Sequence, residues 1–241
     1  MSSPVERSQA RSELMQLLAL GWSHPTPERY QLIADGSYQA VLAQVTQLYF
    51  GAPCELNLPL LPFSDFESLY IELFSVGNNG KPAVGLNAGD YGQLLDGQPR
   101  PEFMQQYAGW YKHFGIKVRQ SEQSNEQPDH LVCQLEFLAW LAKLEADHDG
   151  KPVLQNGYQR AQRDFLQRHL QPFLAIAIPK LEQQVSKRNG SAYFAELGNL
   201  LSDVSDKIFH ELNSVLGPSL QVIDATQAST TSTAENVDLW S

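Results

Sequence analysis

The protein has 241 residues, enough for one large domain or two small ones with a substantial core. Hydrophobic residues make up 42% and charged residues 18% of the chain, a composition that fits an ordinary globular protein and excludes a disordered or collagen-like one. The 27 acidic residues outnumber the 17 basic ones, so the formal net charge is −10. This charge argues against nucleic-acid binding, which needs a basic face, and permits attraction to a basic peptide or domain.

Cysteine content and hydropathy point to a reducing compartment. The two cysteines, Cys54 and Cys133, lie far apart and in no C-x-x-C pair, so neither a disulfide framework nor a zinc ribbon is available. No segment has the pattern of a signal peptide, and the longest apolar run, around 173–178, is too short to cross a membrane. We therefore expect a cytoplasmic protein without a membrane span.

The chain is expected to be all-α, because leucine is abundant and β-branched runs of alternating polarity are nearly absent. Apolar periodicity and capping signals predict a bundle of about nine helices, at residues 4–20, 27–34, 38–50, 64–75, 101–114, 128–147, 157–170, 173–187 and 191–216. Three of the starts carry capping signals, namely Ser3–Pro4, Thr26–Pro27 and a capping box formed by Ser64 and Glu67.

Two stretches between these helices predict long loops. Residues 77–97 are rich in glycine and asparagine, and residues 116–127 are polar without an apolar period. The second stretch divides the chain near its middle and is a possible hinge. After Gly217 the sequence is too poor in apolar residues to fold alone, so we expect one helical domain over 1–217 and a flexible tail over 218–241, or alternatively a strand-like arm that lies on the domain.

The predicted helix at 64–75 carries an aromatic-rich face. At helical spacing it presents Phe66, Leu69, Tyr70, Leu73 and Phe74. Such a face ordinarily belongs to the core. The Tyr70 hydroxyl, however, prefers an aqueous edge, and Glu72 nearby is acidic, so part of this helix is alternatively the lining of a groove for an apolar peptide with a basic flank.

The predicted helix at 128–147 is apolar around most of its circumference, which places it at the centre of the bundle. Its leucines, Leu135 among them, are assigned to the core. Asp129 and His130 at its start are not explained in this way. A carboxylate in a first turn is favourable at the positive end of the helix dipole, which would be a sufficient structural role for Asp129; a functional role for the pair is the alternative.

Familiar signatures of catalysis and cofactor binding do not occur in the sequence. His130 and Cys133 lie three residues apart, but no second ligand pair accompanies them, so we expect no metal site. Residues 145–156 imitate a calcium loop but end in asparagine, and residues 75–82 lack two of the required positions of a P-loop. We therefore expect no enzymatic activity and no bound cofactor.

Two short motifs, in a fixed order, carry a resemblance to a known family. Residues 70–74, Tyr-Ile-Glu-Leu-Phe, match the pattern Y/F/W-x-x-L-F, and residues 126–130, Glu-Gln-Pro-Asp-His, approximate E-P-x-D-H with Gln127 inserted before the proline. Residues 164–170 are similar to a later F-x-x-x-H-L segment. Over about residues 10–215 the chain resembles the TorD/DmsD/NarJ-type chaperones, the maturation proteins of molybdenum oxidoreductases.

The resemblance implies a non-catalytic cytoplasmic chaperone. Its partner would be the catalytic subunit of an apo-molybdoenzyme, held by the twin-arginine leader so that export waits until the molybdopterin cofactor is inserted. By this analogy the peptide-binding residues are Tyr70, Leu73, Phe74, Glu126, Asp129 and His130, the first three lining a groove and the last three making polar contacts or forming a hinge. His130, whose side chain ordinarily titrates near neutrality, is a candidate to modulate binding.

Two other functions stay open at this point. One is an assembly adaptor that binds a folded redox-enzyme subunit independently of a signal peptide. The other is a cofactor-handling or nucleotide-dependent enzyme, which would need a site that the sequence does not display. The sequence does not determine the client enzyme, direct binding of a nucleotide or molybdenum cofactor, or the choice between monomer and homodimer.

Overall fold

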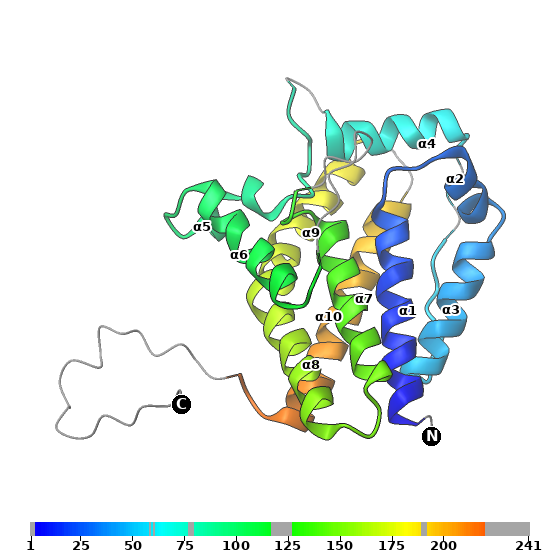
Figure 1. Cartoon of the computed structure of the whole chain (residues 1–241). Coiled ribbons are helices and arrows are strands. Elements are labelled where there is room, and N and C mark those ends of the chain that lie inside the picture. Colours follow the sequence, from blue (N-terminus) through cyan, green and yellow to red (C-terminus); the bar gives the residue numbers. More distant parts are fainter. Residues whose placement is uncertain are drawn as a thin grey trace.

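The computed structural model describes residues 3–57, 59, 61–76, 80–116, 127–188 and 192–219. Within these residues the chain is all-α and forms a single domain without strands, as predicted (Figure 1). The α-helices are α1 (Pro4–Trp22), α2 (Pro27–Ala34), α3 (Ser37–Phe50), α4 (Phe63–Tyr70), α5 (Gly92–Leu95), α6 (Arg100–His113), α7 (Leu131–Asp147), α8 (Pro152–Phe165), α9 (Gln171–Ser186) and α10 (Tyr193–Leu216). Two π-helical turns, η1 (Ile71–Ser75) and η4 (Leu166–Leu170), continue α4 and α8, and the 3-10 turn η3 (Ala88–Asp90) precedes α5.

Each of the nine predicted helices has a counterpart in the structure. The additional helix α5 is a four-residue turn inside residues 77–97, which the sequence predicts to be a loop. Most of the predicted hinge at 116–127 and of the predicted tail at 218–241 lies outside the described residues.

The helix starts confirm two of the three capping signals. Ser3 and Glu6 form a capping box at α1, and the Thr26 hydroxyl accepts a hydrogen bond from the Arg29 amide at α2. The predicted box of Ser64 and Glu67 is wrong. Helix α4 begins one residue earlier, because the Pro62 carbonyl already accepts hydrogen bonds from the amides of residues 65 and 66, so Ser64 lies inside the first turn.

Two other boundaries differ from the sequence-based expectation. Helix α8 begins at Pro152 and not at residue 157, because proline suits the first helical position, where no N–H partner is needed. Helix α7 begins at Leu131 and not at residue 128. His130 is its N-cap, and the Nδ1 atom of His130 accepts a hydrogen bond from the Val132 amide at 3.2 Å. Asp129 therefore precedes the helix and is not part of its first turn.

Helices α8 and α9 follow one another through η4 without a break, with Pro172 in the first turn of α9 and Pro179 inside α9. Pro172 has no N–H, and in a regular α-turn its ring would collide with the carbonyl of residue 168. The wider turn η4 lies directly before it and is closed by a hydrogen bond from the Gln171 amide to the Leu166 carbonyl. We attribute η4 to this proline, since a π-turn is a common way to relieve such a collision.

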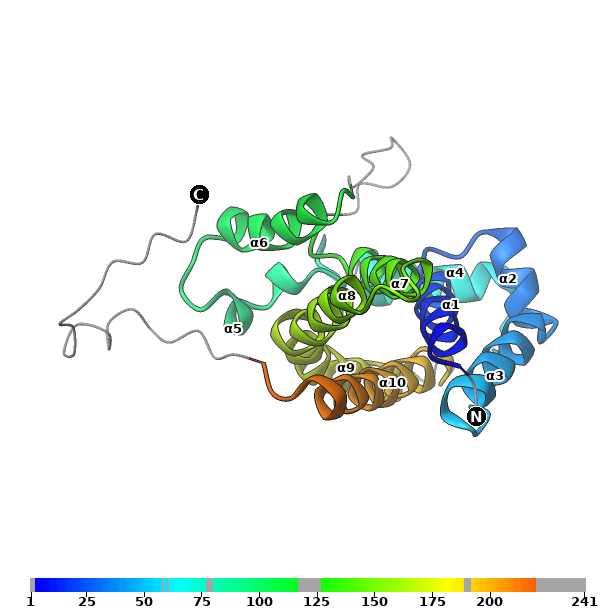
Figure 2. The same cartoon turned by 60° about the horizontal axis from the view of Figure 1, so that its bottom comes forward.

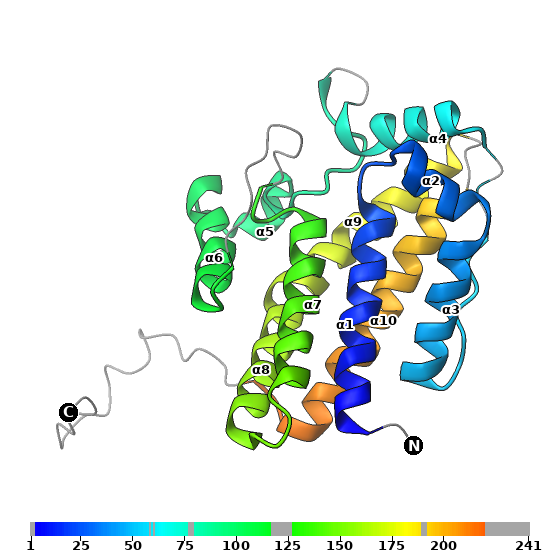
Figure 3. The same cartoon turned by 45° about the vertical axis from the view of Figure 1, so that its right-hand side comes forward.

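The central bundle consists of α1, α7, α8, α9 and α10, with α1 packed most extensively against α7 (Figure 1). Helices α2 and α3 lie beyond α1, and α4 crosses one end of the bundle (Figure 3). Helices α5 and α6 lie on the other side, beside α7 and α8 (Figure 2). Helix α7 is the centre of the core, as predicted: Leu135, Leu138 and Leu141 are 2% exposed or less.

A buried ion pair joins the two central helices. The Arg11 guanidinium on α1 lies 3.2 Å from the Glu145 carboxylate on α7, and both side chains are almost fully buried. Gln162 on α8 and Tyr49 on α3 each bond to the guanidinium, and Ser8 donates to the carboxylate. Removing either charge would leave the other buried without a partner, which typically costs several kcal/mol. The network therefore holds α1, α3, α7 and α8 in one relative register.

The described helices contain no stretch that is both long enough and apolar enough to span a membrane.

The central position of α7 generates a stability prediction. Leu135→Ala is expected to lower the free energy of unfolding by about 2–5 kcal/mol, because it leaves a cavity in a fully buried position. Leu154→Ala on α8 is the matched control, since Leu154 is 43% exposed and its loss should cost less than about 1 kcal/mol. Chemical denaturation of both variants measures the difference, and equal losses would contradict the central role of α7.

Candidate functional site

The first motif lies where α4 continues into η1. Tyr70 is the last residue of α4, and Leu73 and Phe74 lie in η1. Their exposed fractions are 5%, 0% and 7%, so all three side chains belong to the core. The Tyr70 hydroxyl donates a hydrogen bond to the Trp22 carbonyl at 3.1 Å. In this conformation the motif offers little surface to a ligand.

An aromatic cluster surrounds these side chains and connects three distant segments. The Phe74 ring lies 5.6 Å from the ring of Trp22 at the end of α1 and 5.2 Å from the ring of Phe194 at the start of α10. Tyr70 also contacts the His24 ring at 5.2 Å. The motif therefore ties the ends of α1 and α10 to η1. Direct contact between the motif and a peptide would require one of these segments to move aside.

Glu72 points away from this cluster and is already paired. Its carboxylate lies 2.7 Å from Arg188 Nε, beyond the end of α9. The ion pair is partly exposed, so its net contribution to stability is small. A basic peptide could therefore bind Glu72 only by displacing Arg188 from its carboxylate.

The second motif contains a carboxylate that is fully buried, Asp129. The Asp129 side chain is 0% exposed, and its Oδ2 atom accepts a hydrogen bond from the Gly89 amide at 2.7 Å. The Asp129 carbonyl accepts two more, from the Ala88 amide at 3.1 Å and from Gln134 Nε2 at 2.9 Å. Asp129 thus binds the loop before α5 to the start of α7. This role replaces the expected interaction with the helix dipole.

Close packing at Gly89 makes the Asp129 contact possible. A Cβ atom at Gly89 would lie 2.9 Å from Asp129 Oδ2 and 3.2 Å from the Arg100 side chain, so only glycine fits without a shift of the carboxylate or of Arg100. Arg100 lies on the outer side and pairs with Asp90 at 2.8 Å and with Gln127 Oε1 at 2.7 Å. No local sequence signal marks Gly89 and Arg100 as part of the site, because they lie 40 and 29 positions before Asp129 in the chain.

The environment of Asp129 disfavours its charged form. Burial raises the pKa of the carboxyl group, while the hydrogen bond from Gly89 and the charge of Arg100 act against that rise. Its second oxygen, Oδ1, has no hydrogen-bond partner among the residues that the structure describes. Asp129 is therefore held at an energetic cost by its surroundings, as is common for groups at functional sites.

His130 is neutral at physiological pH in this structure. Burial lowers its pKa to about 4. The bond from the Val132 amide to Nδ1 requires an unprotonated Nδ1, so the ring proton lies on Nε2. The expectation that His130 titrates near neutrality is wrong for this reason. Its role in the structure is to cap α7.

A single loop connects the two motifs. The Val84 amide donates to the Leu73 carbonyl at 2.7 Å, and two residues later the Leu86 carbonyl accepts from the Leu131 amide at 2.8 Å. We call residues 84–91 the bridging loop. Most of its residues are buried, so it covers backbone of both motifs. The motifs are 40 residues or more apart in the sequence, but this loop makes them one structural unit.

The surface next to the second motif is hollowed. The depression has a volume of about 480 Å³ and is lined by Arg100, Pro101, Met104, Gln105, Ala108, Gln127 and Pro128. Glu126, the remaining predicted contact, lies outside the described residues, but its neighbour Gln127 is at the rim of this depression. No group of three or more His, Cys, Asp or Glu side chains within the described ranges is placed to hold a metal ion.

Comparisons with known proteins cover nearly the whole chain. A family model described as nitrate reductase delta subunit matches residues 38–178, which include both motifs. The chain is 32% identical to the dimethyl sulfide dehydrogenase assembly chaperone protein of Rhodovulum sulfidophilum, over 98% of this chain and 94% of that protein. It is 30% identical to the perchlorate reductase assembly chaperone protein of Dechloromonas aromatica (strain RCB), over 87% of this chain and 95% of that protein. It is 35% identical to the selenate reductase assembly chaperone protein of Thauera selenatis, over 61% of this chain and 69% of that protein.

The buried bond between Asp129 and Gly89 predicts a large effect on stability. Asp129→Ala is expected to lower the free energy of unfolding by about 1–3 kcal/mol, because the buried Gly89 amide loses its acceptor. Asp147→Ala is the control: the Asp147 carboxylate is exposed and pairs with Lys143 within α7, so the loss should stay near 0.5 kcal/mol or below. Denaturant titration of the two variants would contradict the structural role of Asp129 if both lost the same amount.

The lowered pKa of His130 predicts a pH effect of definite sign. The unfolded chain protonates His130 near pH 6.5, whereas the folded chain resists protonation down to about pH 4. The contribution of His130 is therefore complete above pH 6.5 and is lost as the pH falls toward 4, by at most about 1.4 kcal/mol per pH unit. His130→Asn keeps an N-cap acceptor without a titrating group, so its stability should fall less between pH 6.5 and 5.

Melting temperatures measured across this pH range check the prediction. His113→Asn, at an exposed position on α6, is the matched control and should retain the pH dependence of the unmodified protein. Identical pH dependence in the His130 and His113 variants would show that His130 is not the group responsible.

Proposed function

The chain belongs to the nitrate reductase delta subunit family of NarJ/TorD-type redox-enzyme maturation chaperones, and we propose on this basis that it is a cytoplasmic chaperone of a molybdopterin-containing oxidoreductase. It would bind the apo form of the catalytic subunit through the twin-arginine leader and assist cofactor insertion before export. The named relatives are assembly chaperones and not catalysts, so no reaction is assigned to this chain.

The observation that carries this proposal is the extent of the similarity. The relative from Rhodovulum sulfidophilum aligns over 98% of the chain, so the match includes the bundle and both motifs and is not limited to one short segment. The relatives are named for the assembly of a dehydrogenase, a perchlorate reductase and a selenate reductase. An oxidoreductase is therefore the best supported kind of partner.

The charge of the chain supports recognition of an arginine-containing leader. With a net charge of −10, the protein attracts a basic segment at long range, and carboxylates bind the guanidinium group through paired, charge-assisted hydrogen bonds. The proposed contacts remain Tyr70, Leu73, Phe74, Glu126, Asp129 and His130.

Four of these contacts are buried, so binding at the motifs would need a local opening. Tyr70, Leu73, Phe74 and Asp129 are all less than 9% exposed. The bridging loop, residues 84–91, is the first segment to move, because it is hydrogen-bonded to both motifs. Contact with the Tyr70 and Phe74 rings would also need the end of α1 or the start of α10 to move. Its displacement would free the Leu73 carbonyl and the Asp129 carboxylate together. We propose this opening as the step that admits the leader.

A second function is favoured by the same burial. A chaperone whose motif side chains stay in the core would recognise its client with its outer surface. In that case the partner would be a folded subunit of the redox enzyme, bound independently of a signal peptide. The motifs would then be structural elements that hold α1, α7 and α10 together.

A peptide-binding comparison separates the two functions. We expect a synthetic peptide with two adjacent arginines before an apolar stretch to bind about tenfold more tightly than the same peptide with two lysines, because lysine cannot form the bidentate contact. Isothermal titration calorimetry with the full chain measures both affinities. If neither peptide binds, the leader-binding function is wrong and the adaptor function is favoured.

A further inference from the structure

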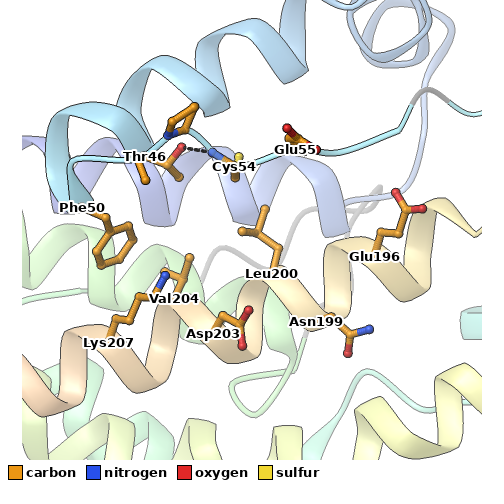
Figure 4. Close-up of a pocket in the computed structure, with 12 residues that line it drawn as sticks. Thr46, Phe50, Cys54, Glu55, Glu196, Asn199, Leu200, Asp203, Val204 and Lys207 are labelled. Atoms are coloured by element: carbon orange, nitrogen blue, oxygen red, sulfur yellow. Dashed lines mark hydrogen bonds between the residues drawn. The ribbon is translucent and has the colours of Figure 1, made fainter.

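A groove lies between α10 and the segment that follows α3, at a distance in the sequence from both motifs. Figure 4 shows its two walls: Phe50 and Cys54 on one side and Leu200, Asp203 and Lys207 on the other. The volume is about 360 Å³. The residues on α10 recur every three or four positions, so they form one face of that helix.

The groove exists because α3 packs against α1 and α2 and not extensively against α10. Two contacts span the space between its walls. At one end, Glu196 on α10 accepts hydrogen bonds from the Asn57 amide and side chain at 3.0 and 2.9 Å. At the other end, the Lys207 ammonium lies 4.9 Å from the centre of the Phe50 ring. The middle of the groove is left open between these two contacts.

Both apolar and acidic groups face this open middle. Leu200 on α10 and the Phe50 ring on the opposite wall are half-buried and supply apolar surface, and the buried Val204 lies beneath them. Glu55 and Asp203 are exposed carboxylates, and neither forms an ion pair with any residue that the structure describes. Lys207 is the one basic residue among the described residues of the lining, and its ammonium is already placed over Phe50. The groove therefore carries an excess of negative charge beside apolar surface.

We propose that this groove binds a peptide segment in which arginine or lysine stands next to apolar side chains. The proposal rests on the proposed function and gives it a second contact surface, separate from the buried motifs. Charge complementarity selects this occupant: a second copy of this chain, at −10, would be repelled by the unpaired carboxylates, as would the phosphates of a nucleic acid. A basic residue would meet Glu55 or Asp203, and its apolar neighbours would cover Leu200 and the Phe50 ring.

The two cysteines provide built-in reporters for the two surfaces. Cys54 lies in the wall of the groove, and Cys133 lies in the first turn of α7, directly after the second motif. Both thiols are partly exposed, and neither forms a disulfide within the described residues. A peptide seated in the groove would slow alkylation of Cys54, whereas a peptide bound at the second motif would slow alkylation of Cys133.

The experiment uses the full chain and one probe, a 20-residue synthetic peptide with two adjacent arginines before a stretch of alanine and leucine. The groove variant is Glu55→Gln with Asp203→Asn. The matched control is Glu13→Gln with Asp149→Asn, which removes the same charge from two exposed positions outside the groove. All four substitutions are at exposed side chains, and equal melting temperatures would verify that both variants fold.

We expect the groove variant to bind the probe about fivefold more weakly than the control, as two exposed ion pairs of moderate strength would give. We also expect the probe to slow iodoacetamide alkylation of Cys54 in the unmodified protein, as followed by mass spectrometry. Higher salt should reduce the difference between the two variants.

Failure of the groove and failure of the proposed function give different results. If the probe binds the groove variant and the control equally and leaves Cys54 unprotected, the groove proposal is wrong and leader binding stands. Protection of Cys133 alone would locate that binding at the second motif. If the unmodified protein does not bind the probe, leader recognition and the groove proposal are both overturned.

Discussion

The buried contact between Asp129 and the bridging loop is the constraint on which the arrangement of both motifs depends. A carboxylate oxygen of Asp129 accepts a hydrogen bond from the Gly89 amide, and the Asp129 carbonyl accepts one from the Ala88 amide. These two bonds fix the loop against the start of α7. A few residues earlier the same loop is fixed to η1 through the Leu73 carbonyl. Asp129 is buried, and one of its carboxylate oxygens has no hydrogen-bond partner among the described residues. Burying such a group costs free energy, so the contact that holds the loop also lowers the stability of the folded state.

Rigidity in the rest of the bundle makes this loop the natural place for a change. The pair Arg11 and Glu145 lies in a buried hydrogen-bond network between α1 and α7, and a separation of these helices would part the two buried charges. The bridging loop is joined to the two motifs and the start of α7 by three backbone hydrogen bonds and by the bond from the Gly89 amide to the Asp129 side chain. In the proposed opening, a client would compete for those contacts and displace the loop together with its buried side chains, Val84, Leu86 and Tyr91.

Local sequence signals predicted the helices well and the site only in part. Apolar periodicity located the nine helices, and the caps at Ser3 and Thr26 were correct because each depends on residues within one turn. The environments of Asp129 and His130 were not predictable in this way: the partner of Asp129 is 40 residues away, and the low pKa of His130 follows from burial that only the tertiary structure creates. The groove beside α10 was missed for the same reason, because its walls are about 150 residues apart in the chain.

The π-turn η4 is closed by a hydrogen bond from the Gln171 amide to the Leu166 carbonyl, five residues back, so it holds one residue more than an α-turn. Each residue in an α-helix advances the chain by about 100° around the axis. If the extra residue continued a regular α-helix, all of α9 would be rotated by that angle relative to α8. Phe173 and Leu174, now almost fully buried, would then turn away from the core. The wide turn takes up the extra residue in place, so α8 and α9 both keep their apolar faces toward the core.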